Sequence, residues 1–345
     1  MTKSSSGFLG SVLSFFASLF GGKGAAAKAK KGPDVPPDSA DEAATVTVSK
    51  VFVVVYDPDM GEGQKLSQKM NWYKVEDLGQ GFMGDILQSS YGLARYQIVE
   101  RVDVNEFPAK LDGFRYTPAS YMDVLRGVTP PHEPAGVDYN AIFSRFSILP
   151  KIAHGEVDEV WIFASPHAGL YESAMGGKGA FFCNAPPIKG TETCPRRFVT
   201  MGFNYERGAG EMLEAFGHRA ESIMVKTFEN LVGNINLWKR FIRYDKAFPG
   251  RAACGNVHYA PNSDRDYDWN NPRSVPSECD DWLTNFPNFK GGEFIREVAS
   301  AEWGSGEIRA HHMWWLKHFP HVNGRLNGIH NNWWQYIIDP NKVIS

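Results

Sequence analysis

The amino-acid sequence predicts an α/β protein with a three-layer core and a mostly parallel sheet, followed by a loop- and Trp-rich C-terminal extension. From residue 47 to about residue 245, short apolar β-branched runs alternate with amphipathic segments, which is typical of βαβ units. Beyond this point the chain is rich in Gly, Pro and Asn, and eight of the ten tryptophans lie after residue 230. We therefore expect three parts: residues 1–46, 47–245 and 246–345.

Four strands are expected in the core. The run KVFVVVYDPD (50–59) is continuous and apolar and ends in turn residues, as buried strands of parallel sheets do. A helix is expected in GDILQSSYGLARY (84–96), followed by strands in YQIVERVDV (96–104), EVDEVWIFASP (156–166) and RRFVTMGFN (196–204). In the extension, HHMWWLKHF (311–319) predicts a helix and NNWWQYII (331–338) a short helix or strand. We expect the extension to pack on the core and not to fold alone.

Residues 1–46 are expected to lie outside the fold, as an amphipathic helix and a disordered linker. Between residues 8 and 20, apolar side chains recur at helical spacing, and lysines follow. The apolar block of about 14 residues is shorter than the roughly 20 that span a bilayer. It fits a signal peptide, a helix that binds a membrane surface or secretion machinery, or a disordered tail. We expect a protein that is secreted, or peripheral to a membrane or envelope.

Composition and motifs exclude several functions. A net charge of -3 and a pI of about 6.4 argue against nucleic-acid binding. The GxGxxG match at Gly79, Gly81 and Gly84 lies far beyond the first strand, so we expect a loop before a helix and no nucleotide cofactor. The four cysteines show no zinc-finger spacing and could form two disulfides or remain buried thiols.

The segment GEMLEAFGHRAESIM (210–224) predicts an amphipathic helix with acids around one histidine. At about 100° per residue, its acidic residues and histidine share one face opposite the apolar side chains. That face could simply be solvated, with Glu214 and His218 paired at i,i+4. It could also bind a metal, since residues four apart can share an ion and residues seven apart hardly can. The candidate metal ligands are His218, Glu214, Glu221, Glu172 and His258.

Further polar residues should reach the same place. The carboxyl ends of parallel strands form one edge of a sheet, where ligands bind in open α/β folds. Glu206 and Glu211 are candidates for the general base that activates a metal-bound water. The candidate substrate-binding residues are His167, Tyr171 and Asn204 near this edge and, as an aromatic platform, Trp314, Trp315, Trp333 and Trp334.

Several stretches resemble a family of uncharacterised bacterial proteins. They are VDEVWIF, YESAMGGKGAFFCNAPP, RRFVTMGFNYERGAGEMLEAFGHRAESIM, RAACGNVHYAPNSDRDYDW and NNWWQYI, and the resemblance covers most of residues 50 to 340. Some members of that family look secreted, with binding modules attached. The resemblance implies export but no activity and no catalytic residues.

Two functions are compatible with these patterns. The first is an exported, metal-dependent hydrolase that acts on a peptide or glycan polymer, with a divalent ion, zinc being one candidate. The second is a non-catalytic surface or assembly protein that binds a glycan or a partner through the aromatic C-terminal region. The hydrolase hypothesis requires that imidazole and carboxylate groups from distant segments meet in one partly desolvated hollow.

Overall fold

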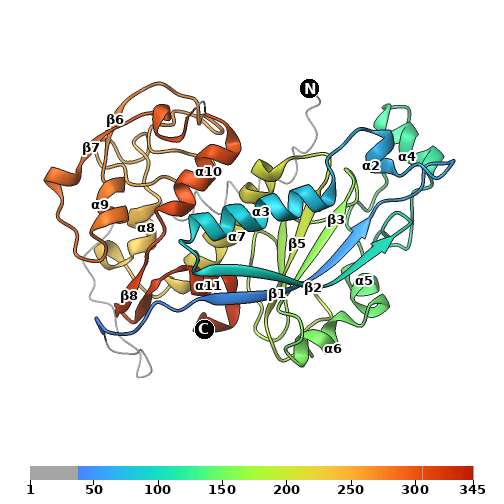
Figure 1. Cartoon of the computed structure of the whole chain (residues 1–345), viewed down its shortest axis with the longest axis horizontal. Helices are drawn as coiled ribbons and strands as arrows, with labels where there is room; N and C mark the ends of the chain where they lie inside the picture. Colours follow the sequence, from blue (N-terminus) through green and yellow to red (C-terminus); the bar gives the residue numbers. More distant parts are fainter. Residues whose placement is uncertain (1–37, 305, 345) are drawn as a thin grey trace.

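A computed structural model describes residues 38–304 and 306–344. At its centre lies a five-stranded sheet in the order β2-β1-β3-β5-β4, with helices on both faces (Figure 1). The first four of these strands are parallel and β4 is antiparallel to β5. The predicted α/β class with a mostly parallel sheet is therefore confirmed. The predicted helix at residues 8–20 lies outside the described residues.

Four of the five strands of this sheet occur where apolar runs predicted them, and the antiparallel strand β4 was not predicted. Their bounds are β1 Thr47–Tyr56, β2 Ala94–Val104, β3 Glu159–Ala164, β4 Ser173–Gly176 and β5 Phe198–Asn204. Strand β1 shows why its run has no polar alternation. Val51, Val53 and Val55 join the core on one face, whereas Phe52, Val54 and Tyr56 join the core on the other. Both faces of the sheet are therefore covered, which defines the three layers.

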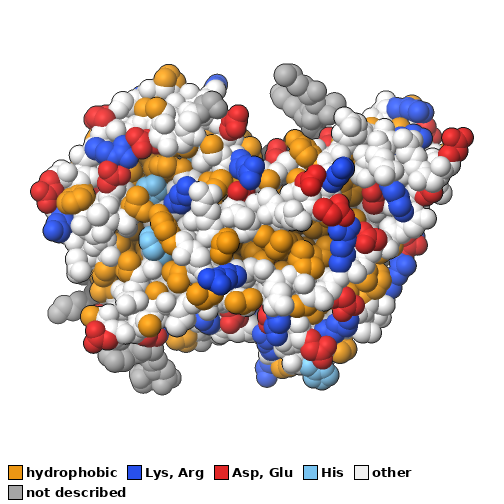
Figure 2. Space-filling model, viewed as in Figure 1, with side chains coloured by type: hydrophobic (Ala, Val, Ile, Leu, Met, Phe, Trp, Pro, Cys, Tyr) orange, Lys and Arg blue, Asp and Glu red, His pale blue; other side chains and the backbone are white. Residues whose placement is uncertain are grey.

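The helices of the α/β part are α2 Leu66–Lys69, α3 Val75–Ser89, α4 Pro118–Leu125, α5 Tyr139–Arg145, α6 Ile148–Ala153 and α7 Ala209–Thr227. Helices α3 and α7 pack on one face of the sheet and α5 and α6 on the other. Helices α2 and α4 belong to a separate, smaller hydrophobic cluster. The GxGxxG glycines lie inside α3, so the expected loop at this motif was wrong. On the face shown in Figure 2, hydrophobic side chains gather below α3, where edge strand β2 exposes Ile98 and Val99.

The C-terminal region consists of short elements. Its helices are α8 Leu237–Phe241, α9 Cys279–Thr284, α10 Ile308–Lys317 and α11 Trp334–Ile338, and its strands are β6 Val275–Ser277, β7 Arg296–Val298, β8 His321–Leu326 and β9 Ile329–Asn332. Four 3-10 turns, Gly233–Ile235, Gly292–Phe294, Ser300–Trp303 and Pro340–Lys342, complete it. Its buried side chains belong to the same cluster as those of α3 and α7. The region and the sheet thus share one hydrophobic core.

The aromatic platform expected on this region does not form. Trp315, Trp333 and Trp334 are fully buried, and Trp314 is half-buried against Trp303. A large apolar ring stabilises a fold most when it is removed from water, and a loop-rich region has few other core residues to contribute. The tryptophans hold the C-terminal region to α7 and cannot present a joint ligand surface.

Three further observations bear on the sequence-based expectations. All four cysteines are buried, free thiols. Residues 38–46 lie along the C-terminal hairpin, where Ser39 bridges Arg325 and Glu42 forms an ion pair with the same arginine. Among the helices of the described residues, none has the length and apolarity needed to cross a bilayer.

Candidate metal centre

Helix α7 is buried along most of its length, and its acidic face is buried with it. Glu214, His218 and Glu221 are only 7%, 6% and 3% exposed. The solvated-face interpretation is therefore wrong, because the C-terminal region covers the side of α7 that points away from the sheet. Ionisable groups are costly to bury unless they are paired or bind an ion, so each of these side chains requires a partner.

The orientation of α7 is fixed by Arg219, the residue that follows His218 in the helix. This guanidinium is fully buried and donates to Glu159 Oε1 on β3 at 2.6 Å and to the carbonyl of Ile337 at 3.1 Å. Since successive helical residues are about 100° apart, the side chain of His218 must point away from the sheet. It points towards the loop that carries His258.

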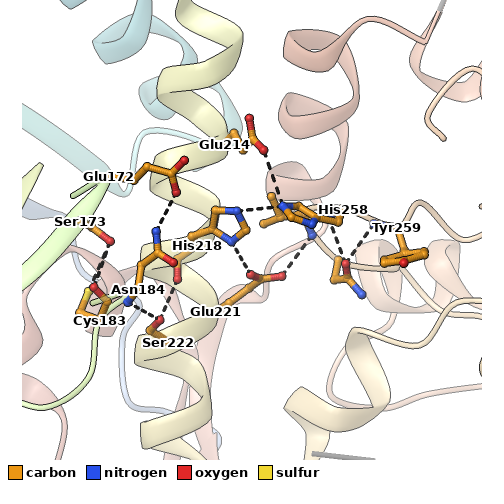
Figure 3. Close-up of polar contacts among 12 residues, drawn as sticks. Glu172, Ser173, Cys183, Asn184, Glu214, His218, Glu221, Ser222, His258 and Tyr259 are labelled. Carbon is orange, nitrogen blue, oxygen red and sulfur yellow. Dashed lines mark hydrogen bonds and ion pairs between the residues drawn. The ribbon is translucent and has the colours of Figure 1, made fainter. Parts of the chain in front are cut away.

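Two histidines and one carboxylate converge here from distant parts of the chain (Figure 3). The Nε2 atom of His218 lies 3.0 Å from the Nε2 atom of His258. Glu214 Oε1 lies 3.6 Å from the same His258 nitrogen. The potential ligand atoms of the three residues all lie within 4.8 Å of one another. The convergence that the hydrolase hypothesis required is present.

The other nitrogen of each histidine faces a carboxylate. Nδ1 of His218 lies 3.0 Å from Glu221 Oε2, and Nδ1 of His258 lies 2.9 Å from Asp266 Oδ1. The second oxygen of Glu221 accepts a hydrogen bond from the backbone N–H of Val257 at 3.2 Å. Because an ionised carboxylate can only accept, both histidines carry a proton on Nδ1. Their Nε2 atoms therefore face each other, and either a proton on one of them or a metal ion can lie between them.

Two imidazole nitrogens 3.0 Å apart need a proton or a metal ion between them. A tetrahedral ion with ligands at about 2.0–2.2 Å has donor atoms about 3.3–3.6 Å apart, close to the observed 3.0 and 3.6 Å. The carboxylate–histidine pairs match the outer shell of histidine metal sites. The surrounding charges favour a positive species at this point: burial alone would lower the pKa of His258, but Asp266 and Glu214 raise it to about 10, so a metal ion would bind here by displacing the second proton of His258.

Glu214 remains ionised in this setting. Burial alone would raise its pKa, but the hydrogen bond from His258 and the nearby charges of His312, His218 and His258 outweigh burial and lower the pKa to about 2. Once the second proton of His258 is displaced, the group offers one carboxylate and two imidazole nitrogens. This donor set suits a divalent ion such as zinc.

A tyrosine that the sequence did not single out reaches the same point. The hydroxyl of Tyr267 lies 3.2 Å from His258 Nε2, and burial raises its pKa, so the phenol keeps its proton. Its backbone adopts φ +56°, a left-handed conformation that is unusual for a bulky residue. Strain of this kind concentrates at functional sites. With 47% of its surface exposed, Tyr267 stands at the boundary between the group and solvent.

A pocket of about 710 Å³ opens over the group. It is lined by Glu172, Asn184, Glu211, Glu214, His218, His258 and Tyr267, among others. Arg207 and Glu211 also line a larger groove of about 1580 Å³ that runs along the start of α7, so the two hollows meet at these residues. The group is thus open to solvent on one side, as a site that receives a substrate must be.

Two of the predicted metal ligands occupy other roles. Glu221 is turned to the far side of His218 and binds its Nδ1, as expected from the seven-residue separation from Glu214. Glu172 is exposed in the pocket, where the side chain of Asn184 donates to its Oε2 at 2.7 Å. Asn184 is itself held to α7, because its backbone N–H donates to Ser222 Oγ at 2.9 Å. Glu172 therefore faces the metal group from the opposite wall (Figure 3).

The remaining predicted site residues surround the pocket without joining the group. Glu211 accepts a hydrogen bond from the backbone N–H of Gly208 at 3.1 Å and so caps α7. Glu206 is exposed in the turn after β5 and lines the larger groove. His167 and Asn204 line a hollow at the carboxyl ends of β3 and β5, and Tyr171 lines the pocket over the metal group.

A second group in the described part of the chain brings Cys279, Asp280 and His318 within 4.8 Å of one another. Its donors are already engaged. Asp280 pairs with Arg296 through two contacts, the longer being 3.0 Å, and the Cys279 thiol lies 3.7 Å from Asp280 Oδ1. Burial raises the pKa of Cys279 to about 12, so the thiol is protonated. This group is satisfied by protein contacts alone.

Comparison with known proteins adds no assignment. No protein-family model, curated protein or solved structure matches the chain. The function must therefore be argued from the geometry of the site.

Proposed function

We propose that the protein is a metal-dependent hydrolase that acts on a peptide or glycan polymer. The observation that carries the proposal is the pair of Nε2 atoms of His218 and His258, 3.0 Å apart and beside Glu214, at the base of an open pocket. Three protein ligands with one position open to the pocket is the arrangement of catalytic zinc sites, whereas structural sites are closed by four.

The residues around the ion would have distinct roles. An ion held by Glu214, His218 and His258 would polarise the bond to be cleaved and lower the pKa of a bound water. Glu172 faces that position and carries a free carboxylate oxygen, so we assign it the role of general base. Tyr267 would donate a hydrogen bond from its protonated phenol to the oxygen on which negative charge develops.

Glu211 is the weaker candidate for the base. One of its oxygens is committed to the backbone N–H of Gly208, so it is less free to turn towards a substrate or a water in the pocket. Glu206 lies farther along the groove and would contact substrate instead.

The shape of the site supports a long substrate. The groove of about 1580 Å³ that joins the pocket carries Arg126, Arg207 and Arg309 as well as Glu206 and Glu307. Such a surface of mixed charge can bind several successive units of a chain. Export, and docking to a membrane or to secretion machinery through residues 8–20, belong to the same proposal and are motivated by the apolar pattern of that segment.

The test separates ion binding from chemistry. Purified protein should retain about one divalent ion per chain by elemental analysis, and it should cleave a labelled peptide or cell-wall glycan in a screen of polymers. Glu172→Gln should keep the ion and lose about 10²–10⁴-fold in kcat, the usual contribution of a general base. Glu206→Gln serves as the matched control and should change KM more than kcat.

Two results would overturn the proposal. One is a protein that takes up no divalent ion after dialysis against zinc, manganese or cobalt. The other is hydrolysis that survives complete chelation of the ion.

A further inference from the structure

A second pocket, of about 410 Å³, lies in the C-terminal region and is lined by three arginines and one acid. Arg240 lies on α8 and Arg243 just after it, Arg251 lies in the following loop, and Glu278 follows β6. Within the described part of the chain, no residue lines both this pocket and the one over the metal group. The arginine pocket is therefore a separate hollow with an excess of positive charge.

Backbone hydrogen bonds hold the segments of this pocket together. The carbonyl of Arg243 accepts from the N–H of Ala253 at 3.0 Å, so the segment that begins at Arg251 runs beside the end of α8. The carbonyl of Ala252 accepts from the N–H of Glu278 at 3.0 Å. The charged side chains thus start from three hydrogen-bonded segments, and their proximity does not depend on one flexible loop.

Glu278 neutralises only one of the three arginines. Its two carboxylate oxygens accept from Nε and Nη2 of Arg240 at 2.8 and 2.7 Å, which is a bidentate pair. Among residues 38–304 and 306–344, Arg243 and Arg251 form no ion pair, and their side chains donate no hydrogen bond. Two positive charges therefore line the pocket without a counter-charge in contact with them.

The guanidinium of Arg243 is positioned without using its hydrogen-bond donors. It packs over the ring of Phe248, 5.3 Å from the ring centroid, and its Nε atom is enclosed and has no partner among the described residues. Burial and the neighbouring charges of Arg251 and Arg240 lower its pKa. A charged donor in this position is destabilising unless an acceptor meets it. The terminal nitrogens are left to supply that contact in the pocket.

We propose that Arg243 and Arg251 bind a doubly charged tetrahedral oxyanion, such as the phosphate group of a monoester, in this pocket. Two guanidinium groups without a counter-charge match its two negative charges. Its three acceptor oxygens can meet donors from two directions, whereas a carboxylate has one charge and two oxygens. The volume lies in the range of small-molecule sites, so there is space for the molecule that carries the phosphate.

The test is calorimetric titration of the full chain with phenyl phosphate, inorganic phosphate and acetate. Divalent ions are first removed by chelation and dialysis, so that no ligand can bind at the metal centre. Both phosphates should bind, and acetate should bind at least about tenfold more weakly because it carries one charge. Tighter binding of phenyl phosphate than of inorganic phosphate would assign the pocket to monoesters, and equal affinities would assign it to the free ion.

Substitutions locate the binding in this pocket. Arg243→Gln and Arg251→Gln should each weaken phosphate binding by about 10–100-fold, because each removes charge-assisted hydrogen bonds. Lys239→Gln is the matched control. Lys239 is an exposed residue of α8 that does not line the pocket, and its loss changes the net charge by the same amount. Its affinity for phosphate should stay within about threefold of wild type.

Two results would overturn the proposal. One is wild-type protein that binds neither phosphate at millimolar concentration. The other is a Lys239→Gln variant that loses as much affinity as Arg251→Gln, which would show attraction by overall charge and no site. Should Arg243→Gln fail to fold, Arg251→Gln decides, because Arg251 is exposed and contributes little to the core. Since the titrations use metal-free protein, neither result bears on the proposed metal centre.

Discussion

The protein contains two groups of histidine and acidic side chains that look alike by distance and differ in every other respect. Glu214, His218 and His258 form one, and Cys279, Asp280 and His318 the other. In the first group, the carboxylates of Glu221 and Asp266 hold the Nδ1 atoms and leave the Nε2 atoms facing inward. In the second, Arg296, which lies beside the group, neutralises Asp280.

The comparison teaches that proximity alone does not define a metal centre. What matters is whether the ligand atoms are free to face an ion. In the first group the two Nε2 atoms contact only each other, Glu214 and Tyr267 among the described residues, and a metal ion can take the place of the proton between them. In the second group, the charge of Asp280 is already paired with Arg296. An ion there would have to displace Arg296 and deprotonate the thiol of Cys279, whose pKa is about 12.

The largest expected effect is the loss of the ion from one group only. His258→Ala should abolish retention of the divalent ion, because it removes a ligand and uncovers the charge of Asp266. Cys279→Ser should retain the ion at the wild-type ratio. Elemental analysis of both variants after identical dialysis checks this. Equal losses in the two variants would show that the groups are not as different as the contacts indicate.

Removal of the ion should destabilise the fold through the first group. At a free-metal concentration of about 100 times Kd, binding adds about 2.7 kcal/mol to the free energy of unfolding. Chelator should therefore lower the Tm of wild type and of Cys279→Ser and leave the Tm of His258→Ala unchanged. Thermal unfolding with and without chelator measures the difference. A chelator effect that persists in His258→Ala would place the stabilising ion elsewhere.

A smaller effect on metal affinity is expected from Asp266, which contacts the ligand His258 but not the ion. Asp266→Asn weakens the contact that orients His258, and metal affinity should fall by about 10–100-fold. Asp264→Asn is the matched control, since Asp264 lies in the same loop but pairs with Arg273. Competition titrations on both variants give the ratio. No difference between them would remove Asp266 from the site.

The smallest effect concerns pH and the second group. Burial lowers the pKa of His318 to about 4, below its ordinary value of 6.5. The unfolded chain therefore takes up the proton first, and His318 should reduce the free energy of unfolding as the pH falls below about 6.5. We expect His318→Gln to remove about 1–2 kcal/mol of this loss at pH 5 and to leave the pH dependence above 7 unchanged. Urea titrations across this range test it, and parallel curves would show that His318 is charged in the fold.

Much of the fold could be predicted because the signals are local. The apolar run at residues 50–59 and the run at 196–204 became β1 and β5, and the acidic segment became α7. Where the local signal was ambiguous the prediction failed: the glycines of GQGFMG read as a loop, but helix packing overrides the modest cost of glycine inside α3.

The site could be predicted in part. The i,i+4 spacing placed Glu214 and His218 within reach of one ion, and His258 was named among the residues that could complete the set. The roles of Glu221 and Glu172 were not predictable, because they depend on which side of His218 each carboxylate approaches. Tyr267 gave no signal, since its importance comes from a backbone conformation that a sequence does not display.

The sequence by itself determined the alternation of strands and helices, the placement of α7 after β5, and the presence of acids and a histidine on one helical face. Periodicity and strand propensity are properties of neighbouring residues, so they can be read along the chain. Only the tertiary structure decided that this face is buried, that the Trp-rich C-terminal region covers it, and that His258 contacts His218. Burial and the approach of distant loops depend on how the whole chain packs.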